Sequence, residues 1–496
     1  MTTLNLMLGA PSARKLDWKH IRWHQVENHV RRLQMRIAKA IKSGRHNKAK
    51  ALQWILTHSF YAKCLAVKRV TQSKGKNTPG VDKVLWRTPN QKMKAALSIT
   101  RRGYKSLPLR RIHILKKNGK MRPLGIPAMH DRAMQALYLL GLEPVSETLA
   151  DKNSYGFRPK RSIHDAIQQC FILLSKKYSS QWILEGDIKA CFDKISHKWL
   201  LDNIMLDKTI LKEWLDAGFI ENNVFKDTVD GVPQGGVASP TCANIALDGL
   251  EKIINSLSHK GDTIHFVRYA DDFICTAKTK ETLEQKVLPM IINFLKERGL
   301  ELSLEKTKIT HIQEGFDFLG FNLRKYKEKL LIKPGKKGIQ AFLEKIRETI
   351  KSMGACKASD LIRVLNPKIR GWSNQYRHVV AKQTFSYIDS QIFSSLWRWA
   401  KRRHPNKNIS WIRNKYFTRI GHRDWCFFSN IKIADVTERL VLIIAADTTI
   451  IRHIKVKAEA NPYNPEFKEY FRQRNLARVY QRYSMKVNSR ATKSGL

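Results

Sequence analysis

The stretch IHFVRYADDFICTA, residues 264–277, carries two adjacent aspartates, Asp271 and Asp272, between two apolar runs. This pattern predicts a strand, a tight turn and a second strand. Two neighbouring carboxylates in a partly buried turn repel each other, and a divalent cation would offset that repulsion. An exposed Asp-Asp turn is the alternative interpretation, and this stretch alone does not decide between the two.

A third carboxylate, Asp187, favours the cation. It directly follows the apolar run WILEG, residues 182–186, which we expect to form a buried strand. At the end of that strand it would lie beside the hairpin tip, and three carboxylates together form a two-metal site for nucleotidyl transfer. Asp193 is the rival to Asp187, although it would instead suit the cap of a helix beginning near Ser196.

The charge of the chain points to a nucleic-acid partner. Its 496 residues contain 91 Lys and Arg against 42 Asp and Glu, a formal net charge of +49. So large an excess repels itself unless a polyanion compensates it. Residues 331–430 hold 21 basic residues against 5 acidic ones, whereas residues 181–310 hold 16 against 20. Basic flanks would grip phosphates, while the acidic middle would concentrate metal ligands.

Local patterns predict the remaining elements. Apolar spacing of three and four residues predicts helices over 18–70, 339–353 and 385–403, the last stopped by Pro405. Residues 74–82 read as a loop. Residues 110–127, RRIHILKKNGKMRPLGIP, predict a hairpin with its turn at Asn118-Gly119.

The seven cysteines are irregularly spaced, with no CxxC pair, so we expect free thiols rather than a zinc site. We find no signal-peptide pattern at the start and no run of 18 apolar residues, and we therefore expect a cytoplasmic protein.

Several ordered blocks together resemble the reverse transcriptases encoded by bacterial group II introns. These blocks are KNTPGVD, YGFRPKRSIHDA, LEGDIKACFDKI, GVPQGGVASPTCANIALDGL and YADD, and they span about residues 70–325. The segment PQGGVASP, residues 233–240, is highly specific for these enzymes and their close relatives. A Gly-rich turn that opens a helix would account for it by structure alone.

The resemblance implies a role for individual residues. It implies that Asp187, Asp271 and Asp272 are catalytic and bind two Mg²⁺ ions, with Mn²⁺ as a substitute, and that the carbonyl of Ile188 joins them. It matches Phe192 to an aromatic that excludes the 2′-hydroxyl, although most Phe residues are simply core. It also matches Lys306 to a lysine that helps pyrophosphate leave. The nucleotide-binding residues that it implies are Lys116, Arg122, Arg110 and Gln234.

Beyond the palm, residues 366–380 and 395–417 resemble the thumb or maturase domain of these proteins. Aromatic and basic residues alternate there, which favours helices that bind RNA by shape. A helical bundle with solvated charges is the alternative. The candidate nucleic-acid contacts are Arg370, Trp372, Tyr376, Arg377, Arg398, Lys401, Arg402 and Arg403.

We therefore expect an α+β right-hand polymerase. The expected segments are an N-terminal helical extension with the start of the fingers (1–105), the fingers and palm (106–330), a helical thumb or maturase domain (331–430) and a basic DNA- and RNA-binding tail (431–496), a remnant of the stretch that precedes an HNH domain. The expected function is RNA-directed DNA synthesis with deoxynucleoside triphosphates on an RNA template with a DNA primer, coupled to splicing and retrohoming of a group II intron into target DNA. The alternatives are a splicing-only maturase and a domesticated reverse transcriptase in phage defence or a CRISPR system.

The end of the sequence carries one further expectation. Residues 452–474 resemble the stretch that precedes an HNH nuclease in related proteins, and His453 is the only histidine after His422. One histidine cannot build such a site, so we expect no second-strand DNA cleavage. As an alternative, Asn461 to Pro465 would be a turn-rich surface loop.

Overall fold

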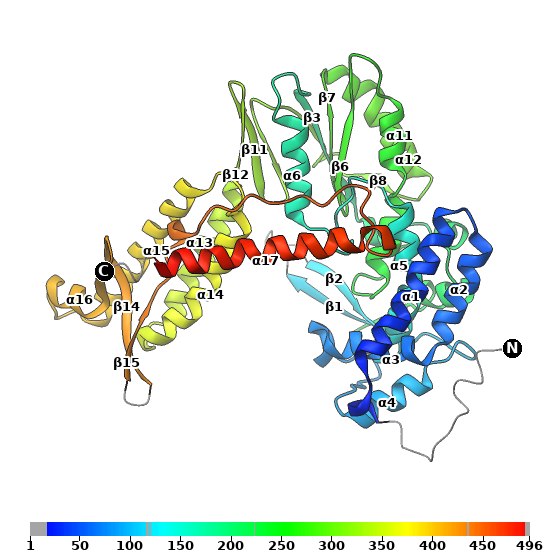
Figure 1. The fold of residues 1–496 in the computed structure, drawn as a ribbon, viewed down its shortest axis with the longest axis horizontal. Helices are drawn as coiled ribbons and strands as arrows, with labels where there is room; N and C mark the ends of the chain where they lie inside the picture. The colour runs from blue at the N-terminus through cyan, green and yellow to red at the C-terminus, as the bar shows by residue number, and fades with distance from the viewer. Residues whose placement is uncertain (1–16, 116–118, 120, 223, 434–435, 492–496) are drawn as a thin grey trace. The chain divides into compact units, whose positions relative to one another are not determined.

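The computed structural model describes residues 17–115, 119, 121–222, 224–433 and 436–491. Contacts divide the chain into two interleaved units. Unit 1 contains the chain up to residue 162 with 184–308 and 456–472, and unit 2 contains 163–183, 309–455 and the residues from 473 onward. Each unit mixes helices with sheets, so the predicted α+β class is confirmed (Figure 1). The boundaries of the four predicted segments stay predictions.

The N-terminal helices of unit 1 form because their apolar residues recur on one face. In α1, Val26, Val30, Leu33, Ile37 and Ile41 are all buried. The predicted helical stretch is broken near residues 43–45 and at Ser59. The helices are α1 (Trp23–Lys42), α2 (His46–His58), α3 (Phe60–Gln72), α4 (Pro89–Ser98) and α5 (Met129–Leu149), with short 3₁₀ turns at Trp18–His20 and Lys74–Asn77.

The predicted hairpin of residues 110–127 is present as β1 (Leu109–Leu115) and β2 (Met121–Ile126). The two strands are antiparallel, with Ile114 opposite Arg122. Gly119 has φ +77°, the left-handed conformation that a tight turn needs, whereas Asn118 lies outside the described residues. The sheet continues through β4 (Phe219–Glu221), which is parallel to β1, to β5 (Val224–Lys226).

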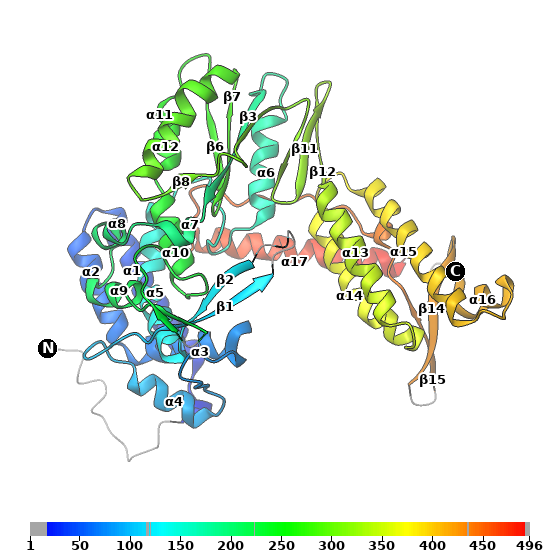
Figure 2. The ribbon, with the colours of Figure 1, turned by 180° about the vertical axis from the view of Figure 1, so that it is seen from behind.

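A second sheet in unit 1 carries the acidic stretch around Asp271 and Asp272, in the strand order β6-β7-β3-β8. Helices α11 and α12 lie along this sheet in both views (Figure 2). The strands are β3 (Trp182–Lys189), β6 (His265–Tyr269), β7 (Asp272–Ala277) and β8 (Glu301–Leu302). The remaining helices of the unit are α7 (Cys191–Lys194), α8 (His197–Asn203), α9 (Lys208–Leu215), α10 (Ser239–Leu247), α11 (Leu250–Ser256), a π-helical turn at Thr282–Val287 and α12 (Leu288–Lys296).

Unit 2 is mainly helical and contains both predicted C-terminal helices. The helices are α6 (Ile163–Leu174), α13 (Lys336–Ser352), α14 (Ala358–Tyr376), α15 (Lys382–Arg403) and α16 (Ile409–Tyr416). Helix α15 ends at Arg403, two residues before Pro405, as the sequence predicts. The strands are β9 (Lys308–His311), β10 (Phe316–Phe318), β11 (Phe321–Tyr326), β12 (Lys329–Pro334), β13 (Phe417–Ile420), β14 (Arg423–Ile433) and β15 (Val436–Val441).

The C-terminal segment 456–472 packs against the N-terminal helices of unit 1. The Tyr463 hydroxyl donates to Glu143 on α5 at 2.7 Å, and Asn461 donates to Thr148 at 3.1 Å. Asn461 is buried. The interpretation of Asn461 to Pro465 as a surface loop is therefore wrong at Asn461, because side chains far away in sequence cover it. Helix α17 (Lys468–Ala491) follows.

All seven cysteines are free thiols, as predicted, and six of them are buried. None of the helices described combines the length and the apolarity that a membrane span requires.

Candidate active site

The acidic stretch forms a hairpin with the aspartates at its tip. Tyr269 pairs with Asp272 across the strands β6 and β7, so Ala270 and Asp271 form a two-residue turn. Ala270 has φ +59°, which is tolerable for so small a side chain. Residues 153–156 support this turn from behind, because Tyr155 N donates to Arg268 O and a Cβ on Gly156 would lie 2.3 Å from Ala270 N. This close approach explains the glycine of the YGFRP block.

Asp187 lies near the end of the neighbouring strand, β3, as predicted. Ser303 N donates to the Asp187 carbonyl at 2.8 Å and fixes the backbone there. The preceding residue, Gly186, packs directly on the ring of Phe273 in β7, and a Cβ at Gly186 would lie 2.2 Å from that ring. This glycine lets β3 and β7 approach closely enough to bring Asp187 beside the hairpin tip.

The three carboxylates share one electrostatic environment. Burial, followed by the charges of Asp271 and Asp187, raises the pKa of Asp272 to about 7. Burial and the Asp187 charge also raise the pKa of Asp271. The Lys306 ammonium forms an ion pair with Asp187, and this hydrogen bond raises the pKa of Lys306. The structure therefore brings together all four predicted catalytic side chains.

Carboxylate oxygens are the ligands that Mg²⁺ prefers, and a cation would offset both the burial and the neighbouring charges that raise the pKa of Asp272. The donor chemistry thus fits a divalent cation. Within the described part of the chain, no three Asp, Glu, His or Cys side chains already converge as a metal-binding group. Ile188 is buried immediately after Asp187, and its role as a carbonyl ligand stays a prediction.

Two predicted nucleotide-binding residues contact each other. Arg122 Nε donates to Gln234 Oε1 at 2.7 Å, and Gln234 Nε2 donates to Asp193 at 3.3 Å. Gly125 N donates to Gln234 O at 2.7 Å, and a Cβ on Gly235 would lie 2.4 Å from Gly125 O. The PQGG block is therefore more than a turn that opens a helix, because its first glycine, Gly235, lets it contact the β1–β2 hairpin.

Phe192 is half-buried and lines a cavity of about 350 Å³ together with Asp193, Gln234 and Pro233. Its ring lies 6.2 Å from that of Phe157, edge to face. It therefore adjoins the Arg122–Gln234 pair and is not enclosed in the core, which is compatible with its predicted contact with a sugar.

Asp193 does not cap the helix near Ser196. The Ser196 hydroxyl itself accepts from Trp199 N and caps α8, because Ser196 occupies the N-cap position and Asp193 belongs to the preceding turn, α7. Arg110 is half-buried in β1, and its Nε has no hydrogen-bond partner among the residues that the structure describes. Lys116 lies outside the described residues.

Residues 114–323 match the family described as reverse transcriptase (RNA-dependent DNA polymerase), and residues 18–99 match its N-terminal domain. Residues 339–417 match the group II intron, maturase-specific domain. Protein YkfC of Escherichia coli (strain K12) is 35% identical over 301 residues, which cover 51% of this chain and 78% of that protein. The chain belongs to the group II intron-encoded reverse transcriptase/maturase family.

Two further similarities were found. Group II intron-encoded protein LtrA of Lactococcus lactis subsp. cremoris is 30% identical over 344 residues, which cover 55% of this chain and 56% of that protein, so the chain spans about half the length of LtrA. A solved telomerase from Candida albicans, in complex with a fragment of telomeric RNA, has 13% identity and a TM-score of 0.37 and covers 62% of this chain and 64% of that chain.

A buried ion pair behind the active site of this reverse transcriptase was missed by the sequence prediction. Arg268, fully buried in β6, pairs with Asp248 and donates to Asn244 Oδ1 at 3.2 Å. It lies three residues before Asp271 and holds the strand that presents the hairpin tip. An arginine within the apolar run FVRYADD was the available signal, because a charge in a buried strand requires a partner.

The predicted nucleic-acid contacts of the maturase domain divide into two groups. Arg370, Arg398, Lys401 and Arg402 are exposed. Trp372 instead stacks on Phe342 at 4.9 Å, and buried Tyr376 donates to Gly320 O, so both pack the helices together. Arg403 donates to the carbonyls of Gly354 and Cys356, and half-buried Arg377 donates to Asn374. Contacts of these eight residues with nucleic acid stay predictions.

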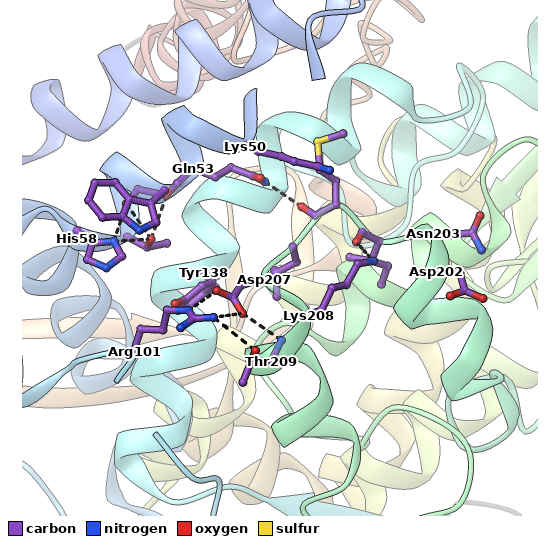
Figure 3. Close-up of a pocket in the computed structure, with 15 residues that line it drawn as sticks. Lys50, Gln53, His58, Arg101, Tyr138, Asp202, Asn203, Asp207, Lys208 and Thr209 are labelled. Atoms are coloured by element: carbon purple, nitrogen blue, oxygen red, sulfur yellow. Dashed lines mark hydrogen bonds and ion pairs between the residues drawn. The ribbon is translucent and has the colours of Figure 1, made fainter. Parts of the chain in front are cut away.

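Unit 1 also contains a cavity of about 600 Å³ between α2 and the segment 202–209 (Figure 3). Asp207 there pairs with Arg101 and caps α9, and Lys208 donates to two carbonyls at the end of α8. These charged groups serve local structure, and none of the predicted catalytic residues lines this cavity.

Proposed function

We propose that this chain is an RNA-directed DNA polymerase that extends a DNA primer on an RNA template by a two-metal mechanism. The observation that carries the proposal is the set of Asp187, Asp271 and Asp272 at the ends of adjacent strands, where burial together with the charges of Asp271 and Asp187 raises the pKa of Asp272 to about 7. Such mutual repulsion is costly in a purely structural site, and a pair of divalent cations would remove it.

The residues of the chain then divide the work. Asp187, Asp271 and Asp272 would hold Mg²⁺, with Mn²⁺ as a substitute. When bound, the ions lower the pKa of the primer 3′-hydroxyl and neutralise charge on the triphosphate. Arg122, oriented by Gln234, binds the phosphates of the incoming nucleotide. Lys306, whose pKa is raised, remains a cation that can give a proton to the departing pyrophosphate.

The partners follow from family membership and from the charge. We infer that the exposed basic residues of the maturase domain bind the folded intron RNA, so that the protein assists splicing and then copies the intron into target DNA. The site of action would be the bacterial cytoplasm, on RNA and the nucleoid. The salt dependence of RNA affinity would be steep because many counterions are released.

The test is primer extension by the purified chain on an RNA template. We expect extension with Mg²⁺ or Mn²⁺, loss of at least about 10²-fold in Asp271→Asn, and unchanged extension in Asp216→Asn, an exposed aspartate at the end of α9. Full extension by Asp271→Asn would overturn the polymerase assignment.

The same variant tests the splicing-only alternative. If polymerisation and splicing assistance are separate, Asp271→Asn should still promote splicing of the intron that encodes the chain. A wild-type chain that promotes splicing but never extends a primer would show that the alternative is correct.

A further inference from the structure

A second cavity, of about 690 Å³, lies in unit 2. Helix α15 forms one side, and the hairpin β13–β14 forms another. Both views show β14 and α16 at the same end of the α13–α15 helices (Figures 1 and 2). Most of the hairpin lies beyond residues 339–417, the stretch that matches the maturase-specific domain.

Aromatic rings line this cavity. They are Phe393 and Trp397 from α15 and Phe417, Trp425 and Phe427 from the hairpin. The ring centroids of Trp397 and Trp425 lie 5.7 Å apart, and those of Phe393 and Trp425 lie 6.0 Å apart. Phe393 is 36% exposed and Trp425 is 39% exposed. Both of these aromatic side chains therefore remain partly accessible to a ligand.

The backbone of Trp425 is strained in a way that presents its side chain. Its φ is +62°, a conformation that a bulky residue rarely adopts. The register between β13 and β14 shifts between Thr418 and Ile420, so Trp425 lies where the pairing is irregular. A glycine would fit this conformation without strain. Keeping a tryptophan in this conformation costs free energy, and strained residues of this kind are typical of binding sites.

Two cations lie against rings of the aromatic cavity, whose lining also includes Asp389 and Asp424. The Arg413 guanidinium lies 4.7 Å from the Trp425 ring centroid, and the Lys401 ammonium lies 5.7 Å from that of Trp397. Residues 395–433 contain ten Lys and Arg and a single acidic residue, Asp424. On the wall of the cavity, Asp389 accepts hydrogen bonds from the backbone N–H groups of Ala445 and Ala446. These bonds offset its negative charge within the protein.

We propose that this cavity binds an unpaired nucleobase of the intron RNA. The partly exposed rings of Phe393 and Trp425 offer apolar surface on which a base can stack, and the basic residues nearby match the flanking phosphates. Two of the lining rings, Phe393 and Trp397, lie in the maturase-specific domain, which favours RNA as the source of the base. This inference rests on the proposed RNA-binding function, but it does not require polymerisation.

The test uses photo-crosslinking of the full chain to a single-stranded 12-nucleotide RNA that carries 4-thiouridine, followed by mapping of the crosslinked peptide. We expect crosslinks within residues 393–427 that are lost in Trp425→Gly, a variant that removes the ring and also relieves the strained backbone. Phe393→Ala is the second variant. The matched control is Tyr387→Ala, because Tyr387 is exposed on the same helix but does not line the cavity.

Affinity provides a second readout. The RNA should bind more tightly than the same backbone with abasic sites, and Trp425→Gly should reduce this preference about 5- to 100-fold while leaving the affinity for the abasic strand unchanged. Thermal unfolding of each variant separates a lost site from a lost fold. Phe393→Ala decides the question if Trp425→Gly does not fold.

Three results would overturn the proposal. Crosslinks that persist in both variants would show that the base binds elsewhere. Stronger crosslinking of a DNA strand of the same sequence would show that the cavity does not prefer RNA. If the oligonucleotide binds without any crosslink in the cavity, the cavity does not bind a base, and another ligand such as a protein segment would have to occupy it. Asp271→Asn should crosslink like the wild type, so a failed polymerase assignment and a failed base site remain distinguishable.

Discussion

Substitution of Gly186 by alanine tests whether the close approach of β3 and β7 positions the active site. The added Cβ would lie 2.2, 2.5 and 2.8 Å from three atoms of the Phe273 ring, whereas ordinary contacts begin near 3.4 Å. The ring or the strand must therefore move by about 1 Å. Overpacking of this kind costs about 1–3 kcal/mol of folding stability. A displacement of about 1 Å beside a catalytic group costs about 10²-fold in rate.

The assays are urea unfolding and primer extension on an RNA template. The control is Gly371→Ala in helix α14, where a Cβ would meet nothing within 4 Å. That change should stabilise the chain by about 0.4–1 kcal/mol, because alanine has less freedom to lose on folding. Adding Phe273→Leu to Gly186→Ala should restore part of the activity. Wild-type stability and activity in Gly186→Ala would refute the packing argument.

Three further predictions concern the charges and the aromatic residue of the site. Arg268→Met should lower the free energy of unfolding by about 3–5 kcal/mol, because it leaves Asp248 buried without its partner; a urea midpoint equal to that of the wild type contradicts this. Because the pKa of Asp272 is raised to about 7, its carboxyl is protonated below that pH, and Mg²⁺ must displace the proton. The Mg²⁺ concentration for half-maximal extension should therefore be about tenfold higher at pH 6 than at pH 8. Equal concentrations at the two pH values would show that protonation of Asp272 does not compete with Mg²⁺ binding. Phe192→Val should relax discrimination against ribonucleotides about 10- to 100-fold, measured by competition between the two nucleotide types, whereas unchanged discrimination would make Phe192 an ordinary packing residue.

Local patterns predicted the hairpins well. The alternation of residues 264–277 predicted β6, β7 and the tip that holds Asp271 and Asp272. The apolar run before Asp187 predicted β3. Because β3 and β7 are neighbours in the sheet, the carboxylates at the ends of these strands lie close together.

Long-range packing was not predictable in the same way. The partner of Arg268, Asp248, is 20 residues away on the other side of α11, and no local pattern links the two. In α14, helical spacing could not tell that Trp372 and Tyr376 face the core while Arg370 faces solvent, because aromatic residues suit both packing and stacking. The sequence could not show that Ser196 caps α8, because the nearby Asp193 is equally suitable as an N-cap by residue type.

The contact between Tyr463 and Glu143 joins residues that are 320 positions apart. During translation at about 5–20 residues per second, the ribosome adds Tyr463 roughly 15–60 s after Glu143. The N-terminal helices must therefore wait for this partner with the Glu143 carboxylate and the neighbouring surface of α5 still open to water. Completion of unit 1 is consequently a late, high-contact-order step of biogenesis. A chain interrupted before residue 456 would contain all the strands that carry the aspartates, but it would lack the segment that packs on α5.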